Sequence, residues 1–213
     1  MNPSDKISCK TFPCKDIEKN SYQIPYLDLN PEKIKIIMIS EVPPLDPKDY
    51  FYSSGNPFYM ETTKEAFNDA GYPINSINDI LNLGVYITTA VKCAKTGTSI
   101  STDTIKECSF ILEEELKLFP NAKAFLLLGD VAIKSFNYIS KRNTNKPTIL
   151  NGSTYKLRSQ SFYYKDKRVF PSYIITGKNF LIEKSKRKMI SEDIKTHLNL
   201  PNIFGNQNLK PYI

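Results

Sequence analysis

Long apolar runs are missing from this sequence of 213 residues. No segment reaches the roughly 18 consecutive apolar residues that a membrane-spanning helix needs. The amino terminus, MNPSDKISCK, also has no apolar stretch of the kind that a secretory signal carries. We therefore expect a cytoplasmic protein that does not enter a membrane.

Glycine-rich phosphate loops are missing as well. Neither GxGxxG nor GxxxxGK[ST] occurs in the sequence, so no nucleotide cofactor is implied. There is no low-complexity tract, and 40% of the residues are apolar, which suits one domain with a sizeable core. We expect a single domain over residues 1–213, with an irregular segment at 1–33 and a tail at 201–213.

Histidine is nearly absent, and basic residues outnumber acidic ones. The single histidine, His197, falls in the last predicted helix, where we expect a surface position. The chain has 29 Lys and Arg residues against 22 Asp and Glu residues, a net charge of +7. A positive surface favours a polyanionic partner such as DNA, because neutralised phosphates release counterions. Lysine-rich surfaces also occur without such a partner.

Only four cysteines are present, and their spacing is C-x4-C, a long gap, then C-x14-C. They are Cys9, Cys14, Cys93 and Cys108. In a cytoplasmic chain they are not expected to form structural disulfides. Spacing alone leaves two interpretations open: a four-cysteine metal site, or buried thiols that only pack.

Alternating strand and helix patterns predict the fold. Apolar runs rich in β-branched residues predict strands at 34–39, 85–91, 122–128 and 168–176. Apolar residues at helical spacing predict helices at 62–70, 77–83, 102–118, 130–140 and 183–198. A hairpin is expected to turn at 157–161. The predicted fold class is α/β, a three-layer α/β/α sandwich with a mainly parallel four-stranded central sheet.

The segment 85–129 forms the clearest strand–helix–strand unit, and its letters resemble a known family. ITTAVKC, followed one helix later by KECSFILEEELKLFPNAKAFLLLG, resembles the iron–sulfur branch of the uracil-DNA glycosylase superfamily. In that branch TNxVKC precedes C-x-P-x-L and a strand that ends in Leu-Gly. IIMISEVPP resembles the family's first motif, GNPFY its base-stacking Pro-Phe, and VFPSYIITGKNFLI the segment with its His-Pro-Ser motif. The resemblance covers about residues 9–198.

The resemblance implies a cofactor. Cys9, Cys14, Cys93 and Cys108 would hold a [4Fe–4S] cluster, for which four thiolates are the usual ligands. The family has two residues between its first two cysteines, whereas this chain has four. Zinc is therefore kept as the alternative metal.

The resemblance also implies catalytic residues. Glu41 matches the glutamate of the first motif, and Asp49 takes the place of the acid that orients water, although Asp46 fits that place too. Lys178 stands at the position of the histidine that stabilises the departing base. An amine there either offers a positive charge to the base anion or attacks C1′ of the sugar. The third reading of Lys178 is contact with a phosphate.

Base-binding and DNA-binding residues follow from the same resemblance. Val42, Phe58 and Thr89 are the implied base-binding residues, with Phe58 stacking on an extruded base. The implied DNA-binding residues are Asn179, Phe180, Leu181, Lys184, Lys186 and Arg187. Thr89 replaces the family's asparagine, and its single hydroxyl cannot make a bidentate contact with uracil. We therefore expect slow release of uracil.

Two functions are compatible with this sequence. The first is a DNA glycosylase that acts as a monomer on single- or double-stranded DNA, extrudes a damaged or modified base and hydrolyses its N-glycosidic bond. The alternative is a catalytically inactive relative that binds nucleic acid or a protein through the same basic face.

Overall fold

The structure, a computed structural model, describes residues 1–199, without the side chains of Lys178 and Asn179. The predicted tail at 201–213 lies outside the described residues. The strands are β1 (Ile17–Glu18), β2 (Ile36–Ser40), β3 (Val85–Thr89), β4 (Ala94–Lys95), β5 (Ala124–Leu128), β6 (Phe162–Tyr164) and β7 (Lys167–Ser172). The α-helices are α1 (Phe58–Asp69), α2 (Ile77–Asn82), α3 (Thr102–Lys117), α4 (Asp130–Thr144), α5 (Thr154–Leu157), α6 (Lys178–Ile182) and α7 (Lys184–Leu198). Short 3-10 turns occur at Pro3–Asp5, Lys19–Ser21, Pro31–Lys33 and Pro47–Asp49.

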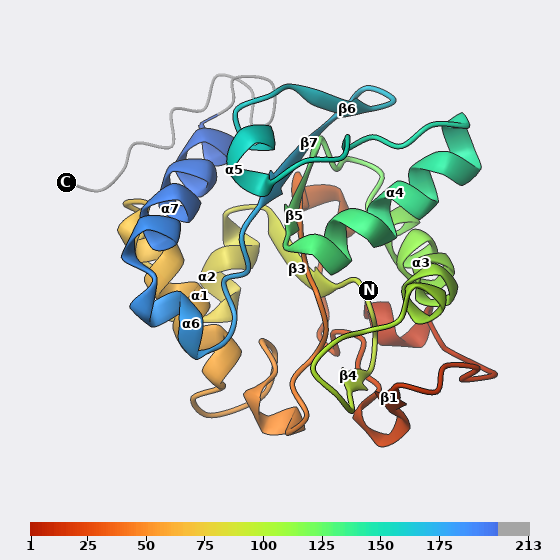
Figure 1. Cartoon of the computed structure of the whole chain (residues 1–213). Coiled ribbons are helices and arrows are strands. Elements are labelled where there is room, and N and C mark those ends of the chain that lie inside the picture. The colour runs from red at the N-terminus through yellow and green to blue at the C-terminus, as the bar shows by residue number, and fades with distance from the viewer. Residues whose placement is uncertain (200–213) are drawn as a thin grey trace.

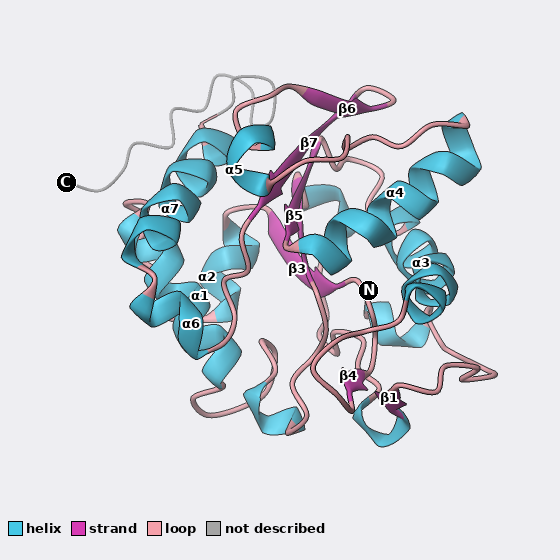
Figure 2. Cartoon of the chain, viewed as in Figure 1, coloured by secondary structure: helices cyan, strands magenta, loops and turns pink. Residues whose placement is uncertain are grey.

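The central sheet has the strand order β3-β2-β5-β7-β6. Neighbours among the first four strands are parallel, and β6 runs antiparallel to β7 at the edge. Helices lie on both sides of this sheet (Figures 1 and 2). The predicted α/β sandwich with a mainly parallel sheet is confirmed, but the sheet has five strands where four were predicted.

The fifth strand comes from a hairpin that the sequence analysis placed wrongly. The segment before 157–161 is the short helix α5, and the true hairpin joins β6 to β7. Its two-residue turn includes Lys165, whose φ of 56° suits the tight turns that match the twist of antiparallel strands. Phe162 is buried and Tyr163 exposed, as expected for an edge strand. Three residues are too few for this alternation to stand out in a sequence.

Alternate side chains of the central strands enter two different cores. On β2, Ile36 and Met38 face one core, whereas Ile37 and Ile39 face the other. Figure 1 shows α1, α2, α6 and α7 on one side of the sheet and α3 and α4 on the opposite side. Because both faces are covered, the parallel strands are continuous apolar runs rather than alternating ones.

The carboxyl-terminal half of α7 is packed against the sheet. His197, predicted to lie on the surface, is only 3% exposed, and its ring lies 3.4 Å from that of Phe170 between centroids. Burial lowers the pKa of His197 to about 3, so its imidazole is neutral at physiological pH. The pattern of α7 in the sequence did not reveal this burial, because the helix has few apolar residues.

None of the described helices has the length and hydropathy needed to cross a bilayer.

A fully buried ion pair joins α3 to the end of β3. Lys92 Nζ lies 2.5 Å from Glu115 Oε2, and neither side chain is exposed to solvent. Lys92 also donates to the carbonyl oxygen of Thr89 and, at 2.9 Å, to the hydroxyl of Thr88. Glu115 accepts hydrogen bonds from Tyr86 and Thr88 at 2.7 and 2.8 Å. All the polar atoms of this network therefore have partners, which is what a buried charge requires.

We predict that Glu115→Ala lowers the free energy of unfolding by about 3–5 kcal/mol, because it leaves the Lys92 ammonium buried without a counterion. Denaturant unfolding followed by circular dichroism measures this loss. Glu114→Ala is the matched control, since Glu114 pairs with Lys117 on the exposed face of the same helix. Equal losses in the two variants would contradict the structural role of the buried pair.

Candidate active site and cysteine cavity

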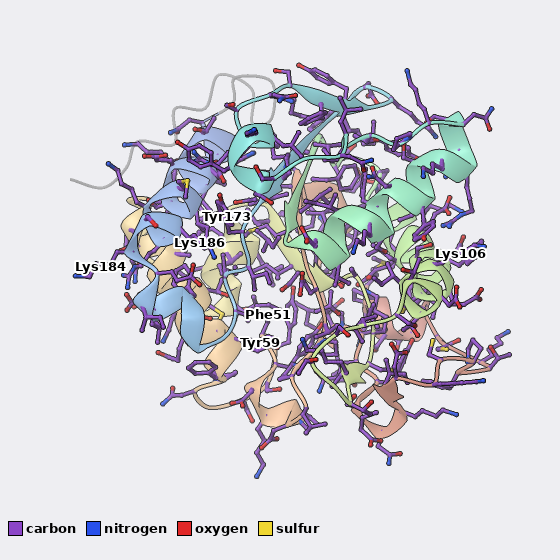
Figure 3. All side chains as sticks on the ribbon, viewed as in Figure 1. Phe51, Tyr59, Lys106, Tyr173, Lys184 and Lys186 are labelled. Carbon is purple, nitrogen blue, oxygen red and sulfur yellow. The ribbon has the colours of Figure 1, made fainter. Side chains whose placement is uncertain are left out.

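A cleft of about 380 Å³ opens at the carboxyl edge of the parallel strands. Glu41 at the end of β2, Gly129 at the end of β5 and Ser172 at the end of β7 form its floor. Open α/β sheets bind their ligands at this edge. Helix α7 contributes Lys186 to the opposite wall, and Figure 3 shows this side chain next to Tyr173.

Glu41 is half-buried and turned onto the amino terminus of α4. Its Oε1 accepts a hydrogen bond of 3.1 Å from the backbone N–H of Val131. Burial raises the pKa of Glu41 above its usual value, and the charge of Asp130 adds to this effect. The Val131 N–H and the charge of Lys95 oppose it. Glu41 is thus a cleft carboxylate that also satisfies a free backbone donor of α4.

Gly129 makes this arrangement possible. Its φ is +97°, a conformation that favours glycine. A Cβ atom at this position would lie 2.5 Å from Glu41 Oε1 and 2.6 Å from Ile174 Cγ1. The missing side chain therefore lets Glu41 and Ile174 approach the same point from two sides.

Ile174 is a cleft residue that the sequence analysis missed. It lies two residues beyond β7, lines the cleft and is 38% exposed. The final strand was predicted to run to 176, but β7 ends at Ser172, so Ile174 belongs to the loop above the sheet edge. Its position just past the end of a central strand was the available signal. An apolar side chain here offers no hydrogen bond to a departing base.

Asp49 and Phe58 are neighbours in the structure. Asp49 Oδ1 accepts a hydrogen bond of 3.4 Å from the N–H of Phe58 at the start of α1. The next residue, Tyr59, is half-buried, with its ring 5.3 Å from that of Phe51 (Figure 3). Burial raises the pKa of Tyr59, the Thr176 hydroxyl lowers it, and the charges of Asp49 and Glu41 raise it again. The charges of the two predicted catalytic carboxylates therefore act on the Tyr59 phenol.

Asp46 takes a different role. Its carboxylate accepts from the N–H of Lys48 at 2.9 Å and begins the exposed 3-10 turn that ends at Asp49. Asp49 therefore fits the place of the predicted acid better than Asp46.

Two predicted base-binding residues do not reach this cleft. Thr89 is completely buried, and its hydroxyl has no hydrogen-bond partner among the described residues. Val42 is half-buried and packs with the cysteines. For Thr89 the reason is the strand order, because β3 is the edge strand beside β2 and its end lies on the far side of β2 from β5 and β7.

The predicted DNA-binding residues divide into two groups. Phe180 is 4% exposed and packs in the core behind the cleft, whereas Leu181 is 43% exposed. Arg187 forms ion pairs with Glu65 and Asp69 of α1, which fixes α7 to that helix. Phe180 and Arg187 therefore make contacts within the protein in this structure, and neither is free to reach DNA in the arrangement described.

The lysines of this region remain compatible with a DNA contact. Lys184 is exposed, and Lys186 forms an ion pair with Glu183. The side chains of Lys178 and Asn179 lie outside the described part of the structure.

All four cysteines line a second cavity, of about 370 Å³. Cys93 and Cys108 are buried, and Cys9 and Cys14 are half-buried. Burial and the neighbouring thiols raise the pKa of Cys93 to about 12. Burial likewise raises the pKa of Cys108 to about 11, although Lys92 lowers it, and the Lys92 N–H donates to Cys108 Sγ at 3.2 Å.

The amino-terminal cysteines reach this cavity because two contacts fix their segment. Strand β1 pairs with β4, directly after Cys93. Asp16 accepts from the N–H of Ser101 at 2.6 Å and from the hydroxyl of Thr104, at the start of the helix that carries Cys108. Asp16 was not identified from the sequence, and its only signal was its place two residues after Cys14.

The arrangement of the thiols bears on the metal that would fit. Among the described residues, no group of three or more His, Cys, Asp or Glu side chains is placed to hold one metal ion. Four thiolates around one zinc ion would lie about 3.8 Å apart, given Zn–S bonds of about 2.3 Å. The four thiols line one cavity without forming such a group.

Comparison with family models identifies one family for this chain. A family model described as the uracil DNA glycosylase superfamily matches residues 27–190. Among solved structures, the chain is similar to "The WT UNG crystal structure from Nitratifractor salsuginis", at 13% identity and a TM-score of 0.42. That match covers 79% of this chain and 76% of the other. A search of curated proteins gives no match.

Gly129→Ala is expected to lower the free energy of unfolding by about 2 kcal/mol or more, because it combines positive φ with overpacking. It should also displace Glu41 from Val131. Thermal or denaturant unfolding measures the first effect. Gly97→Ala is the control, since a Cβ at Gly97 meets nothing within 4 Å. If both variants were equally stable, the close packing at the cleft floor would be disproved.

Proposed function

Because this chain belongs to the uracil DNA glycosylase superfamily, we propose that it is a DNA glycosylase that removes a damaged or modified base. Membership supports a glycosylase-like protein that binds DNA and takes part in DNA repair. The observation that carries the catalytic proposal is the half-buried Glu41 at the floor of the 380 Å³ cleft. A cleft of this size falls in the range of about 300–1,000 Å³ that is usual for small ligands.

The chemistry asked of the cleft is hydrolysis of an N-glycosidic bond. The bond between C1′ and the base nitrogen breaks, its electron pair leaves with the base, and positive charge develops on the sugar. Carboxylates held close to that charge stabilise the transition state electrostatically. Glu41, which lines the cleft, and Asp49, at the end of the 3-10 turn in the loop that follows β2, are the two carboxylates proposed for this role. Either one is also suited to accept the proton of the attacking water.

The surroundings of the cleft suggest how DNA would be held. Phe58 is half-buried beside Asp49 and provides an aromatic ring for stacking on an extruded base. Leu181 and Lys184 are exposed near the cleft wall formed by α7 and provide an apolar contact and a phosphate contact. Thr89 is buried, so uracil would not be read by the contact that the family's asparagine makes.

We also propose that the four cysteines hold a [4Fe–4S] cluster, with zinc as the alternative. The support is that all four thiols line one cavity and that a backbone N–H already points at Cys108 Sγ. Such N–H···S bonds are among the factors that tune iron–sulfur centres. When bound, the cluster would supply a covalent link between the amino-terminal segment, the loop after β3 and α3. Binding would release the thiol protons.

A base-release assay tests the catalytic proposal. Oligonucleotides that carry uracil, hypoxanthine, xanthine, a modified pyrimidine or a methylated purine are incubated with the protein, and free base is quantified. Glu41→Gln should lower the rate for the best substrate by about 10²–10³, because the charge is lost while an oxygen remains to accept from Val131. Because the retained oxygen keeps the hydrogen bond to Val131, the melting temperature should be unchanged.

The control variant is Asp166→Asn, in the β6–β7 turn at the other end of the sheet. It should leave the rate unchanged. A protein that binds DNA but releases none of the bases, including methylated purines, would instead be the inactive binding relative.

Iron analysis tests the cluster. Protein purified without oxygen should be brown, with about four irons per chain, and Cys108→Ser should lose most of that iron. The variant removes a thiolate ligand but changes little else in size. Colourless protein with one zinc per chain would assign the site to the four-cysteine zinc class. Protein free of both metals would disprove the metal site.

A further inference from the structure

The cleft carries an excess of negative charge among its described side chains. Its lining includes three carboxylates, those of Glu41, Asp130 and Glu183, and one ammonium group, that of Lys186. Lys186 forms an ion pair with Glu183, so its charge is balanced locally. Two carboxylates therefore remain without a cation from the described cleft lining.

The helix amino terminus that faces the cleft already has a carboxylate partner. The amino terminus of α4, a helix of 15 residues, points at the cleft and would normally favour a bound anion. In this structure the carboxylate of Glu41 accepts from the Val131 N–H at that terminus. A departing anion would have to displace the chain's own carboxylate, which is anchored from the β2 side.

These two facts bear on the leaving group. A neutral base such as uracil leaves as an anion, and it needs a cation or a strong donor beside it. The described lining of the cleft instead presents mainly carboxylates, and Ile174 faces Glu41 across Gly129. A base that is already positively charged leaves as a neutral molecule, so carboxylates near it favour binding without opposing departure.

The aromatic wall of the cleft fits the same kind of base. Tyr173 lines the cleft, and Lys186 Nζ lies 5.7 Å from the centre of its ring (Figure 3). The ring face is therefore already a site for a cation, and aromatic faces attract cationic heterocycles in the same way. A flat cationic base could take the place of the flexible lysine head on this ring.

We propose that the cleft takes a cationic base, an N-alkylated purine in DNA, and that it releases this base as the neutral alkylpurine. The proposal rests on the proposed glycosylase function and names its substrate class. In the reaction the bond between C1′ and the purine nitrogen breaks, and its electron pair neutralises the base. Water adds its oxygen to C1′ and keeps one hydrogen in the new hydroxyl group, and its other proton passes to a cleft carboxylate and then to solvent. No oxidant, reductant or cofactor is needed.

The test compares two leaving groups on the same DNA. Duplex DNA methylated to carry 7-methylguanine and 3-methyladenine is incubated with the full-length protein, beside duplexes that carry uracil or hypoxanthine. Released bases are quantified by mass spectrometry. Methylpurines should be released faster than uracil and hypoxanthine by about tenfold or more, after subtraction of spontaneous loss.

A charge variant sharpens the comparison. Glu183→Gln removes one carboxylate and leaves the Lys186 ammonium without its partner, so the cleft becomes more positive. The ratio of methylpurine to hypoxanthine release should fall by about threefold to tenfold. Asp166→Asn removes the same charge far from the cleft and should leave the ratio unchanged. Circular dichroism of both variants confirms that they are folded, and the wild-type comparison stands without them.

The outcomes separate the two proposals. Preferential release of methylpurines supports both. Release of uracil or hypoxanthine without release of methylpurines overturns the substrate class and keeps the glycosylase. Binding of duplex DNA with no base released overturns both, and so does protein that neither binds nor cleaves.

Discussion

The buried pair Lys92–Glu115 is the interaction on which both sites depend. Lys92 follows β3 and precedes Cys93, while Glu115 lies on the helix that carries Cys108. Their contact fixes the distance between the loop after β3 and α3. A charge with no exposed surface must be paired, so this geometry has little freedom. The backbone N–H of Lys92 donates to Cys108 Sγ, while Glu115 holds the far end of the Lys92 side chain.

The cysteine cavity and the cleft are joined through the same loop. The N–H of Val91, which lines the cysteine cavity, donates to the backbone carbonyl of Glu41 at 3.0 Å. The N–H of Ala90 donates to the carbonyl of Ser40 at 2.8 Å. The backbone of the cleft carboxylate is thus fixed by the segment that leads to Cys93. A metal bound at the cysteines would stiffen this segment, and through it the position of Glu41.

Elements marked by a regular pattern could be predicted from the sequence. The four parallel strands coincide with runs that are mainly apolar, and the four cysteines could be grouped by resemblance before any geometry was known. Contacts between distant segments could not be predicted in this way. Arg187 has the composition of a phosphate contact, but its partners Glu65 and Asp69 lie more than a hundred residues earlier on α1. Nothing local marks such a pair.

Thr89 and Ile174 show the same limit within the site. The motif placed Thr89 at the base, but the strand order puts the end of β3 behind β2 and closes it from the cleft. Ile174 entered the cleft because β7 ends earlier than its apolar run. Strand ends and strand order are set by packing of the whole sheet, which no single motif contains.

Glu41 combines a structural and a chemical role, and the two limit each other. As a partner of the α4 amino terminus it must stay oriented, and the helix dipole favours its charged form. Burial opposes the charged form and raises the pKa of Glu41.

A histidine-like donor for a departing anion would compete with the Glu41 carboxylate for the same small space above Gly129. Ile174 occupies that space, so among the described side chains the electrostatics of the floor are left to Glu41. A floor of this kind lowers the energy of positive charge on the sugar or the base, and it gives no help to negative charge on the base. The described residues around Glu41 therefore fit a base that is positively charged before the bond breaks, because positive charge then develops on the sugar as the base leaves neutral.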